Sequence, residues 1–168
     1  MPRLFALDQN FPQLLIRAAS PYFQGVELEP IWRIDPRLAE LDDWELLLAL
    51  HHHKRPFDGL ITTDDSMLNQ PRELEIVRQT SLTLVVVKES GHDPIKATGL
   101  LLAHLDSVCS QTTSARPQVW ELTARKRAGQ DPSEFIERVA NHQNRSPEDV
   151  LSEVRLTKAD LDRDPLNG

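Results

Sequence analysis

The stretch SLTLVVV at residues 81–87 decides the fold class, because it is rich in valine and leucine and carries no charge. A short apolar run of this kind is typical of a strand that is buried on both faces, as in a parallel sheet. Helical patterns flank it on both sides. The helical stretch before it is interrupted by Pro71, and Asp93 with Pro94 opens the helix that follows.

The same alternation of strand and helix patterns extends over the first three-quarters of the chain. A proline-started helix follows the first strand, and LDDWELLLALHHH (41–53) is a leucine-striped helix that precedes the third. This order predicts a mostly parallel sheet with helices on both faces, which is a three-layer α/β sandwich. Pro30 places the second strand at an edge. The other predicted strands are 3–7, 26–32, 57–63 and 117–123.

The pattern changes near residue 124, so we predict an α/β domain over 1–123 and a helical C-terminal extension over 124–168. PSEFIERVANHQ and SPEDVLSEVRL are amphipathic helices, whereas the last twelve residues form a polar tail that is expected to fray. The apolar faces of these helices can dock on the domain itself, on a second copy in a homodimer, or on a partner protein. The sequence leaves these three arrangements open.

Composition narrows the class of protein. A chain of 168 residues with 39% hydrophobic content builds one packed domain with a small appendage. The net charge of −7 argues against a protein that coats duplex DNA, but it is compatible with a nuclease whose metal site needs acids. Cys109 is the single cysteine, the start lacks the pattern of a secretory signal, and no apolar run is long enough for a bilayer. We therefore expect a cytoplasmic protein without membrane association.

Several aspartates fall where such a sheet binds ligands, beyond the carboxyl ends of its strands. Asp8 follows the first strand, Asp64 follows the third, and Asp42 with Asp43 opens the helix that leads into the third. Carboxylates so close together repel one another unless a cation joins them. Mg²⁺ and Mn²⁺ prefer oxygen ligands, and either ion can activate water and stabilise charge on a phosphate oxygen.

The alternative for each single acid is a helix cap, and Asp42 in particular has the position of an N-cap. The coincidence of three acids at one predicted edge favours a metal site.

Three segments also fit a known pattern. FALDQNFP, LDDWELLLAL and LITTDDSML resemble, in this order, the LDENLP, DEEIL and LTxDxDF segments of the PIN-like nuclease superfamily, in the group related to the Mut7 C-terminal nuclease domain. The resemblance covers about residues 1–115. It implies a PIN-like sheet and a Mg²⁺ or Mn²⁺ site at Asp8, Asp43 and Asp64, with Asn10, Asp42 and Asp65 in supporting roles.

The resemblance further implies metal-dependent hydrolysis of RNA, by a ribonuclease that serves as the toxin or effector of a small bacterial module and has an antitoxin or other protein partner. The chain departs from the pattern at Gln9, Ser66 and Met67, and only Glu89 and Asp93 stand near the place of a fourth acid. The alternative is therefore a catalytically weakened PIN-like module that binds RNA or a protein partner. A phosphoacceptor receiver domain is disfavoured, because an amide residue and not an acid follows Asp8.

The three tryptophans, Trp32, Trp44 and Trp120, lie among apolar neighbours on predicted elements. Core packing is therefore expected for all three.

Overall fold

A six-stranded sheet forms the centre of the protein, in a computed structural model that describes residues 2–113, 115–125 and 127–167. The strand order is β2-β1-β3-β4-β5-β6. The first five strands run parallel, and β6 is antiparallel to β5. The strands are β1 (Arg3–Leu7), β2 (Val26–Pro30), β3 (Gly59–Thr62), β4 (Thr83–Val87), β5 (Gln118–Leu122) and β6 (Arg127–Gln130).

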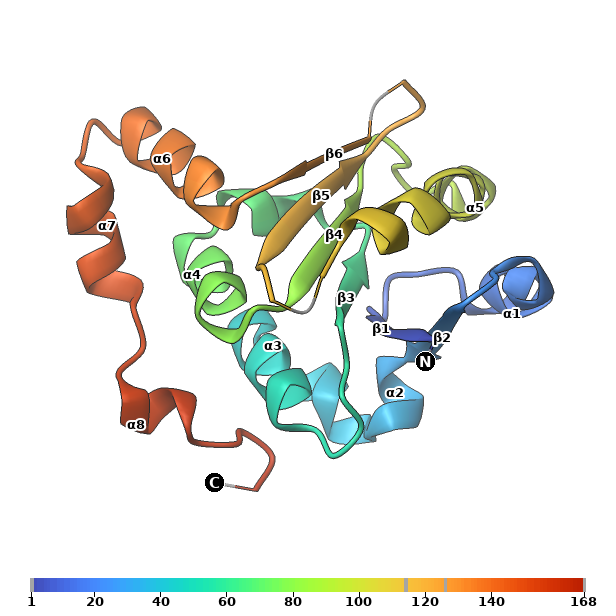
Figure 1. Cartoon of the computed structure of the whole chain (residues 1–168), viewed down its shortest axis with the longest axis horizontal. Coiled ribbons are helices and arrows are strands. Elements are labelled where there is room, and N and C mark those ends of the chain that lie inside the picture. Colours follow the sequence, from blue (N-terminus) through green and yellow to red (C-terminus); the bar gives the residue numbers. More distant parts are fainter. Residues whose placement is uncertain (1, 114, 126, 168) are drawn as a thin grey trace.

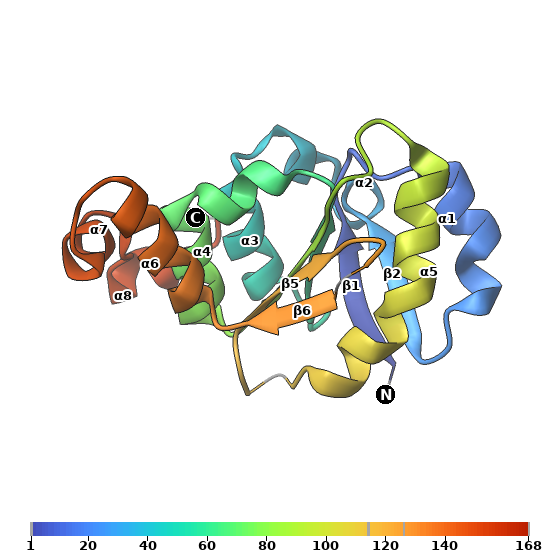
Figure 2. The ribbon, with the colours of Figure 1, turned by 90° about the horizontal axis from the view of Figure 1, so that it is seen from above.

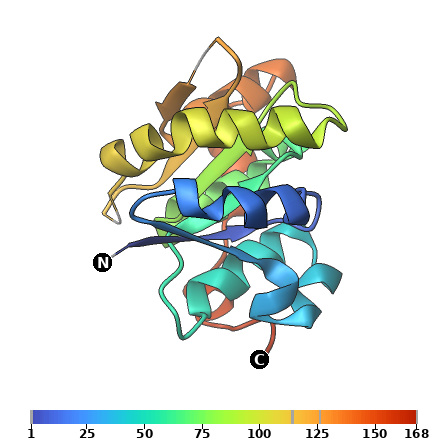
Figure 3. The same ribbon diagram turned by 90° about the vertical axis from the view of Figure 1, so that its right-hand side faces the viewer.

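Helices cover both faces of this sheet, as Figure 2 shows from above. Figure 3 shows α1 and α5 together over one face, and α3, α4 and α6 cover the other. The helices are α1 (Gln13–Ala19), α2 (Ile31–Ile34), α3 (Asp43–His52), α4 (Pro71–Thr80), α5 (Pro94–Gln111), α6 (Pro132–His142), α7 (Pro147–Val154) and α8 (Lys158–Leu161), with 3₁₀ turns η1 (Ser20–Tyr22), η2 (Pro36–Glu40) and η3 (Asp65–Asn69).

Two hydrophobic cores follow from the alternation of side chains along the strands. In β1, Phe5 and Leu7 join the core under α1 and α5, whereas Leu4 and Ala6 join the core under α3 and α4. Every residue of β4 is buried, which is expected for a central parallel strand. The predicted mostly parallel α/β sandwich is therefore confirmed at this level, and Pro30 does lie in an edge strand.

The structure differs from the prediction at β6, which the sequence analysis placed in a helical extension. Its four residues, RAGQ, carry no alternating apolar pattern that marks a strand. Contact with β5 explains the strand, because a Cβ on Gly129 would lie 2.5 Å from the ring of Trp120. Only glycine allows this close approach. The domain boundary after residue 123 stays a prediction.

The three tryptophans do not share one environment. Trp120 is buried as expected, and Trp44 is partly buried against the core. The expectation for Trp32 is wrong, because β2 ends at Pro30 and the side chain of Trp32 on α2 is 50% exposed.

The C-terminal part packs on the α/β layers (Figure 1). Phe135 and Ile136 of α6 and Val150 of α7 are buried in the core beside α4. The polar tail does not fray as expected, because the carbonyl oxygen of Leu161 lies 2.6 Å from Nε2 of His52 and that of Leu166 accepts a hydrogen bond from Arg37.

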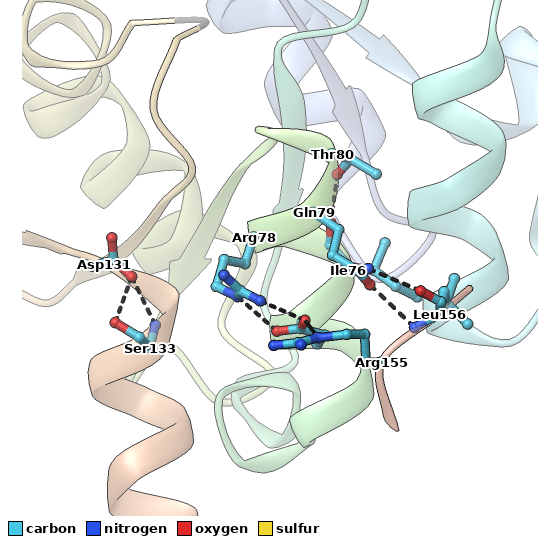
Figure 4. A network of polar contacts seen from close by, with 9 residues as sticks. Ile76, Arg78, Gln79, Thr80, Asp131, Ser133, Arg155 and Leu156 are labelled. Atoms are coloured by element: carbon cyan, nitrogen blue, oxygen red, sulfur yellow. Dashed lines mark hydrogen bonds and ion pairs between the residues drawn. The ribbon is translucent and has the colours of Figure 1, made fainter. Parts of the chain in front are cut away.

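A polar network joins α4 to the two residues that directly follow α7, Arg155 and Leu156. Arg78 and Arg155 both contact the carboxylate of Glu75, which is fully buried, at 2.7 Å and 3.1 Å. Beside them the side-chain amide of Gln79 donates to the carbonyl oxygen of Leu156 and accepts from its N–H, as Figure 4 shows. The segment after α7 therefore has a defined place on the molecule.

Candidate functional site

The carboxyl ends of β1 and β3 lie side by side, and they form the place where the chain changes direction across the sheet. From β1 the chain continues outward to β2, whereas from β3 it continues the other way to β4. A crevice beyond such a switch point is where open α/β sheets bind ligands. The N–H of Asp8 donates to the carbonyl oxygen of Ile61 at 2.9 Å, so Asp8 is fixed at this point.

The carboxylate of Asp8 is almost completely buried, with 6% of the residue exposed. Oδ2 accepts a hydrogen bond from the hydroxyl of Thr62 at 2.7 Å, and Oδ1 accepts one from the N–H of Gln9 at 2.7 Å. Burial raises the pKa of Asp8 above its usual range, and the charge of Asp64 adds to this rise, although both hydrogen bonds act against it. Among the described residues, no cation forms an ion pair with Asp8 or contributes to the shift of its pKa.

Thr62 connects Asp8 to Asp64. The Thr62 hydroxyl is fully buried, and it accepts a hydrogen bond from the N–H of Asp64 at 3.0 Å while it donates to Asp8. Asp64 caps η3, because its Oδ1 accepts the N–H of Ser66 at 2.9 Å. One threonine therefore sets the positions of two of the predicted acids.

Asp43 is the first residue of α3, and Asp42 is its N-cap. Burial raises the pKa of the Asp43 carboxyl, and the charges of Asp8, Asp64 and Asp42 raise it further. These three carboxylates are thus near enough for their charges to act on Asp43. The structure brings the three predicted ligands to one region at the end of β1 and β3.

Two residues that sequence reasoning missed also belong to this region. One is Thr62, and the other is Glu73 of α4. Burial raises the pKa of Glu73, and the charges of Asp43 and Asp42 contribute. In the sequence Glu73 is an ordinary first-turn acid after Pro71, so no local signal marks it. For Thr62 the only signal in the sequence is its position, as the last residue of a buried strand.

A pocket of about 410 Å³ opens at this edge of the sheet. Asp64 and Asn10 lie in its wall, and His92 and Asp93 come from the loop between β4 and α5. Asn10 is exposed at the pocket, while the partners of the Asp8 carboxylate are Thr62 and Gln9. Among the described residues Asn10 makes no hydrogen bond to the Asp8 carboxylate, and its predicted role in orienting Asp8 or a metal-bound water stays a prediction.

The remaining predicted residues have other surroundings. Asp65 is exposed and lies in the wall of a separate pocket with Lys88 and Glu121. Ser66 is exposed, whereas Met67 is fully buried and fills the apolar position that the resemblance assigns to phenylalanine. Asp93 caps α5 by accepting the N–H groups of Ile95 and Lys96.

The donor set at this site fits a hard divalent cation in its chemistry, because the charge of Asp64 acts on Asp8 and Asp43, whose pKa values are raised, and a cation would compensate these negative charges. The side chains are not arranged as a ligand shell. Over residues 2–113, 115–125 and 127–167, no group of three histidine, cysteine, aspartate or glutamate side chains has a geometry that could hold a metal ion. Each oxygen of Asp8 accepts one hydrogen bond and keeps a lone pair for a cation, so binding would require a change in how the three side chains are placed.

Comparison with known proteins adds no family to these observations. In the described part of the chain, no helix is both long and apolar enough to cross a membrane. No family model, no curated protein and no solved structure matches this chain.

Proposed function

We propose that this protein is a PIN-like ribonuclease that depends on Mg²⁺ or Mn²⁺. The observation that carries the proposal is the convergence of Asp8, Asp43 and Asp64 at the switch point of the sheet, with a raised pKa at Asp8 and Asp43. Sites that concentrate uncompensated carboxylates cost stability, and proteins keep them mainly where chemistry uses them. The three motifs that resemble the PIN-like superfamily contain these same residues.

In this proposal Asp8, Asp43 and Asp64 hold the cation. Bound there, the ion would stabilise charge on a scissile phosphate and lower the pKa of a water molecule. Thr62 orients Asp8 through the hydrogen bond to Oδ2. Asn10 lies in the wall of the open pocket, where its amide N–H can donate to a phosphate oxygen of an RNA strand. The role of toxin or effector, with an antitoxin as partner, extends this proposal.

The test is cleavage of labelled single-stranded and hairpin RNA with Mg²⁺, with Mn²⁺ and with EDTA. The variants are Asp8→Asn and Asp43→Asn, and the matched control is Asp106→Asn, which removes an exposed carboxylate on α5. We expect metal-dependent cleavage in the wild type and the control and its loss in the two site variants. Equal cleavage by Asp8→Asn would refute the assignment.

A second candidate is a PIN-like module that binds RNA or protein without turnover. The observation that favours it is the arrangement of the acids, because within the described residues no group of three histidine, cysteine, aspartate or glutamate side chains is placed to hold a metal ion. The chain also lacks acids at Gln9 and Ser66, where the PIN-like pattern has them. RNA that binds a folded wild-type protein but stays intact in both metals would favour this candidate over the nuclease.

A further inference from the structure

An apolar groove lies at the edge of the molecule away from the C-terminal helices, between α1, the edge strand β2 and α2 (Figure 1). Its volume is about 380 Å³. Leu14 of α1 is 84% exposed and Trp32 of α2 is 50% exposed, and both line it. Large apolar side chains exposed together on a water-facing surface mark an interaction site.

Two arginines stand at the groove, although the protein as a whole carries a net charge of −7. Arg17 is exposed on the last turn of α1, and within the described residues it has no ion-pair partner. Arg33 is half exposed beside Trp32, and its only carboxylate in the described chain is Glu29 at 4.0 Å. The charge of this surface thus differs in sign from that of the protein.

A polar group in the groove also has no partner. The side-chain nitrogen Nε2 of Gln13 is buried and makes no hydrogen bond to any described residue. A buried donor without an acceptor lowers stability, and a bound acceptor would remove that cost. Gln13 lines the groove, so a ligand that lies there can supply the missing hydrogen-bond acceptor.

We propose that this groove binds an acidic amphipathic helix of a partner protein. Apolar side chains of that helix contact Leu14 and Trp32, and its carboxylates pair with Arg17 and Arg33. Helices pack into apolar grooves through anchors at positions i, i+3, i+4 and i+7. An added strand fits less well, because Pro30 in β2 lacks the N–H that such pairing uses.

Two other occupants are less favourable. RNA needs several cations along its backbone, whereas the lining here is mainly apolar and one of the two arginines already faces Glu29. A second copy of this chain is disfavoured by charge, and its amphipathic helices α6 and α7 already bury their apolar residues beside α4. The inference is independent of the proposed nuclease activity.

The test is selection of a displayed library of helical peptides against the full chain. The library has fixed leucines at i, i+3, i+4 and i+7, and each exposed position is glutamate, lysine or serine. We expect glutamate to be enriched, and we expect selected peptides, measured by fluorescence anisotropy, to lose about tenfold or more in affinity with Leu14→Glu or with Arg17→Glu. The matched controls, Ile95→Glu and Arg116→Glu, change exposed residues away from the groove and should leave affinity unchanged.

Three results would overturn the inference. The first is enrichment of lysine, or no enrichment at all. The second is binding that Leu14→Glu leaves intact while the fold is retained by circular dichroism. The third is a groove that serves another occupant: a wild-type dimer in sedimentation equilibrium that Leu14→Glu dissociates, or single-stranded RNA that binds in place of the acidic peptides and is lost with Arg17→Glu.

Discussion

Two groups of buried carboxylates in this protein have opposite surroundings. Glu75 on α4 is fully buried, and the guanidinium groups of Arg78 and Arg155 both contact it. Asp8 at the end of β1 is buried almost as completely, but its partners are a neutral hydroxyl and a neutral N–H, and the nearest charges that act on it are negative. The two acids are thus buried to a similar degree, but among the described residues only Glu75 has arginines beside it.

The comparison teaches what each group contributes. A carboxylate with two arginines contributes a fixed contact between segments, here between α4 and the residue after α7. A carboxylate that is buried among other carboxylates lowers stability at neutral pH, and it is retained where binding of a cation or substrate compensates. The predictions below test this contrast, beginning with the largest expected effect.

The largest effect is expected from removing both arginines of the first group. Arg78→Met with Arg155→Met leaves Glu75 buried without a cation, and the free energy of unfolding should fall by about 3 kcal/mol. This is the lower end of the usual range because both guanidinium groups are partly exposed. Urea unfolding measures it. Adding Glu75→Met should recover most of the loss, and a double variant as stable as the wild type would contradict the role given to Glu75.

The sequence alone could not predict this network. In RELEIVRQT, Glu75 and Arg78 have the spacing of an ordinary exposed pair on a helix, and Arg155 lies 80 positions from Glu75 along the chain. Glu75 is buried because α4 is covered by the sheet on one side and by α6 and α7 on another. Such burial depends on tertiary packing that local periodicity does not encode.

The α/β alternation and the positions of the rim acids, by contrast, could be predicted. Valine-rich runs and proline-started helices mark the elements locally, and an acid that follows a buried strand must lie at the carboxyl edge of a parallel sheet. The contact from Thr62 to Asp8 could not, because it requires the register between β1 and β3. The four-residue strand β6 was missed for a related reason, since its pairing depends on Trp120.

A second prediction concerns Thr62 in the acidic group. Thr62→Val keeps the shape of the side chain but removes the hydroxyl that donates to Oδ2 of Asp8 and that accepts the N–H of Asp64. We expect a loss of about 2 kcal/mol in the free energy of unfolding. Thr62→Ser keeps the hydroxyl, and it should cost about 1 kcal/mol for the lost methyl group. A valine variant with wild-type stability would show that these hydrogen bonds do not hold the two acids.

A third prediction tests compensation by a cation. At a concentration ten times its dissociation constant, Mg²⁺ or Mn²⁺ should stabilise the wild type by about 1.4 kcal/mol. For a chain of this length the melting temperature would rise by roughly 3–6 °C. Asp43→Asn should reduce the rise, while Asp106→Asn on α5 should keep it. Equal rises in both variants would mean that the ions bind elsewhere.

The smallest effect is expected at Glu73, which is buried near Asp43. Within the described residues it forms no ion pair, and the charge of Arg72 offsets only part of the rise in its pKa. Because burial raises its pKa, the folded protein binds the proton more tightly than the unfolded chain. Above the folded pKa the ionised carboxylate lowers stability, and this cost disappears as the pH falls through the folded pKa toward the ordinary glutamate pKa of 4.5.

Glu73→Gln should therefore be more stable than the wild type at pH 7, by on the order of 1 kcal/mol or less, and the difference should shrink on acidification. Thermal unfolding of both proteins across this pH range measures it, with the exposed Glu137→Gln on α6 as the control that should show no such trend. If the stability difference between Glu73→Gln and the wild type grew as the pH fell, Glu73 would be a stabilising charge like Glu75. The contrast between the two groups of carboxylates would then end at Asp8 and Asp43, because only their pKa values would still reflect uncompensated burial.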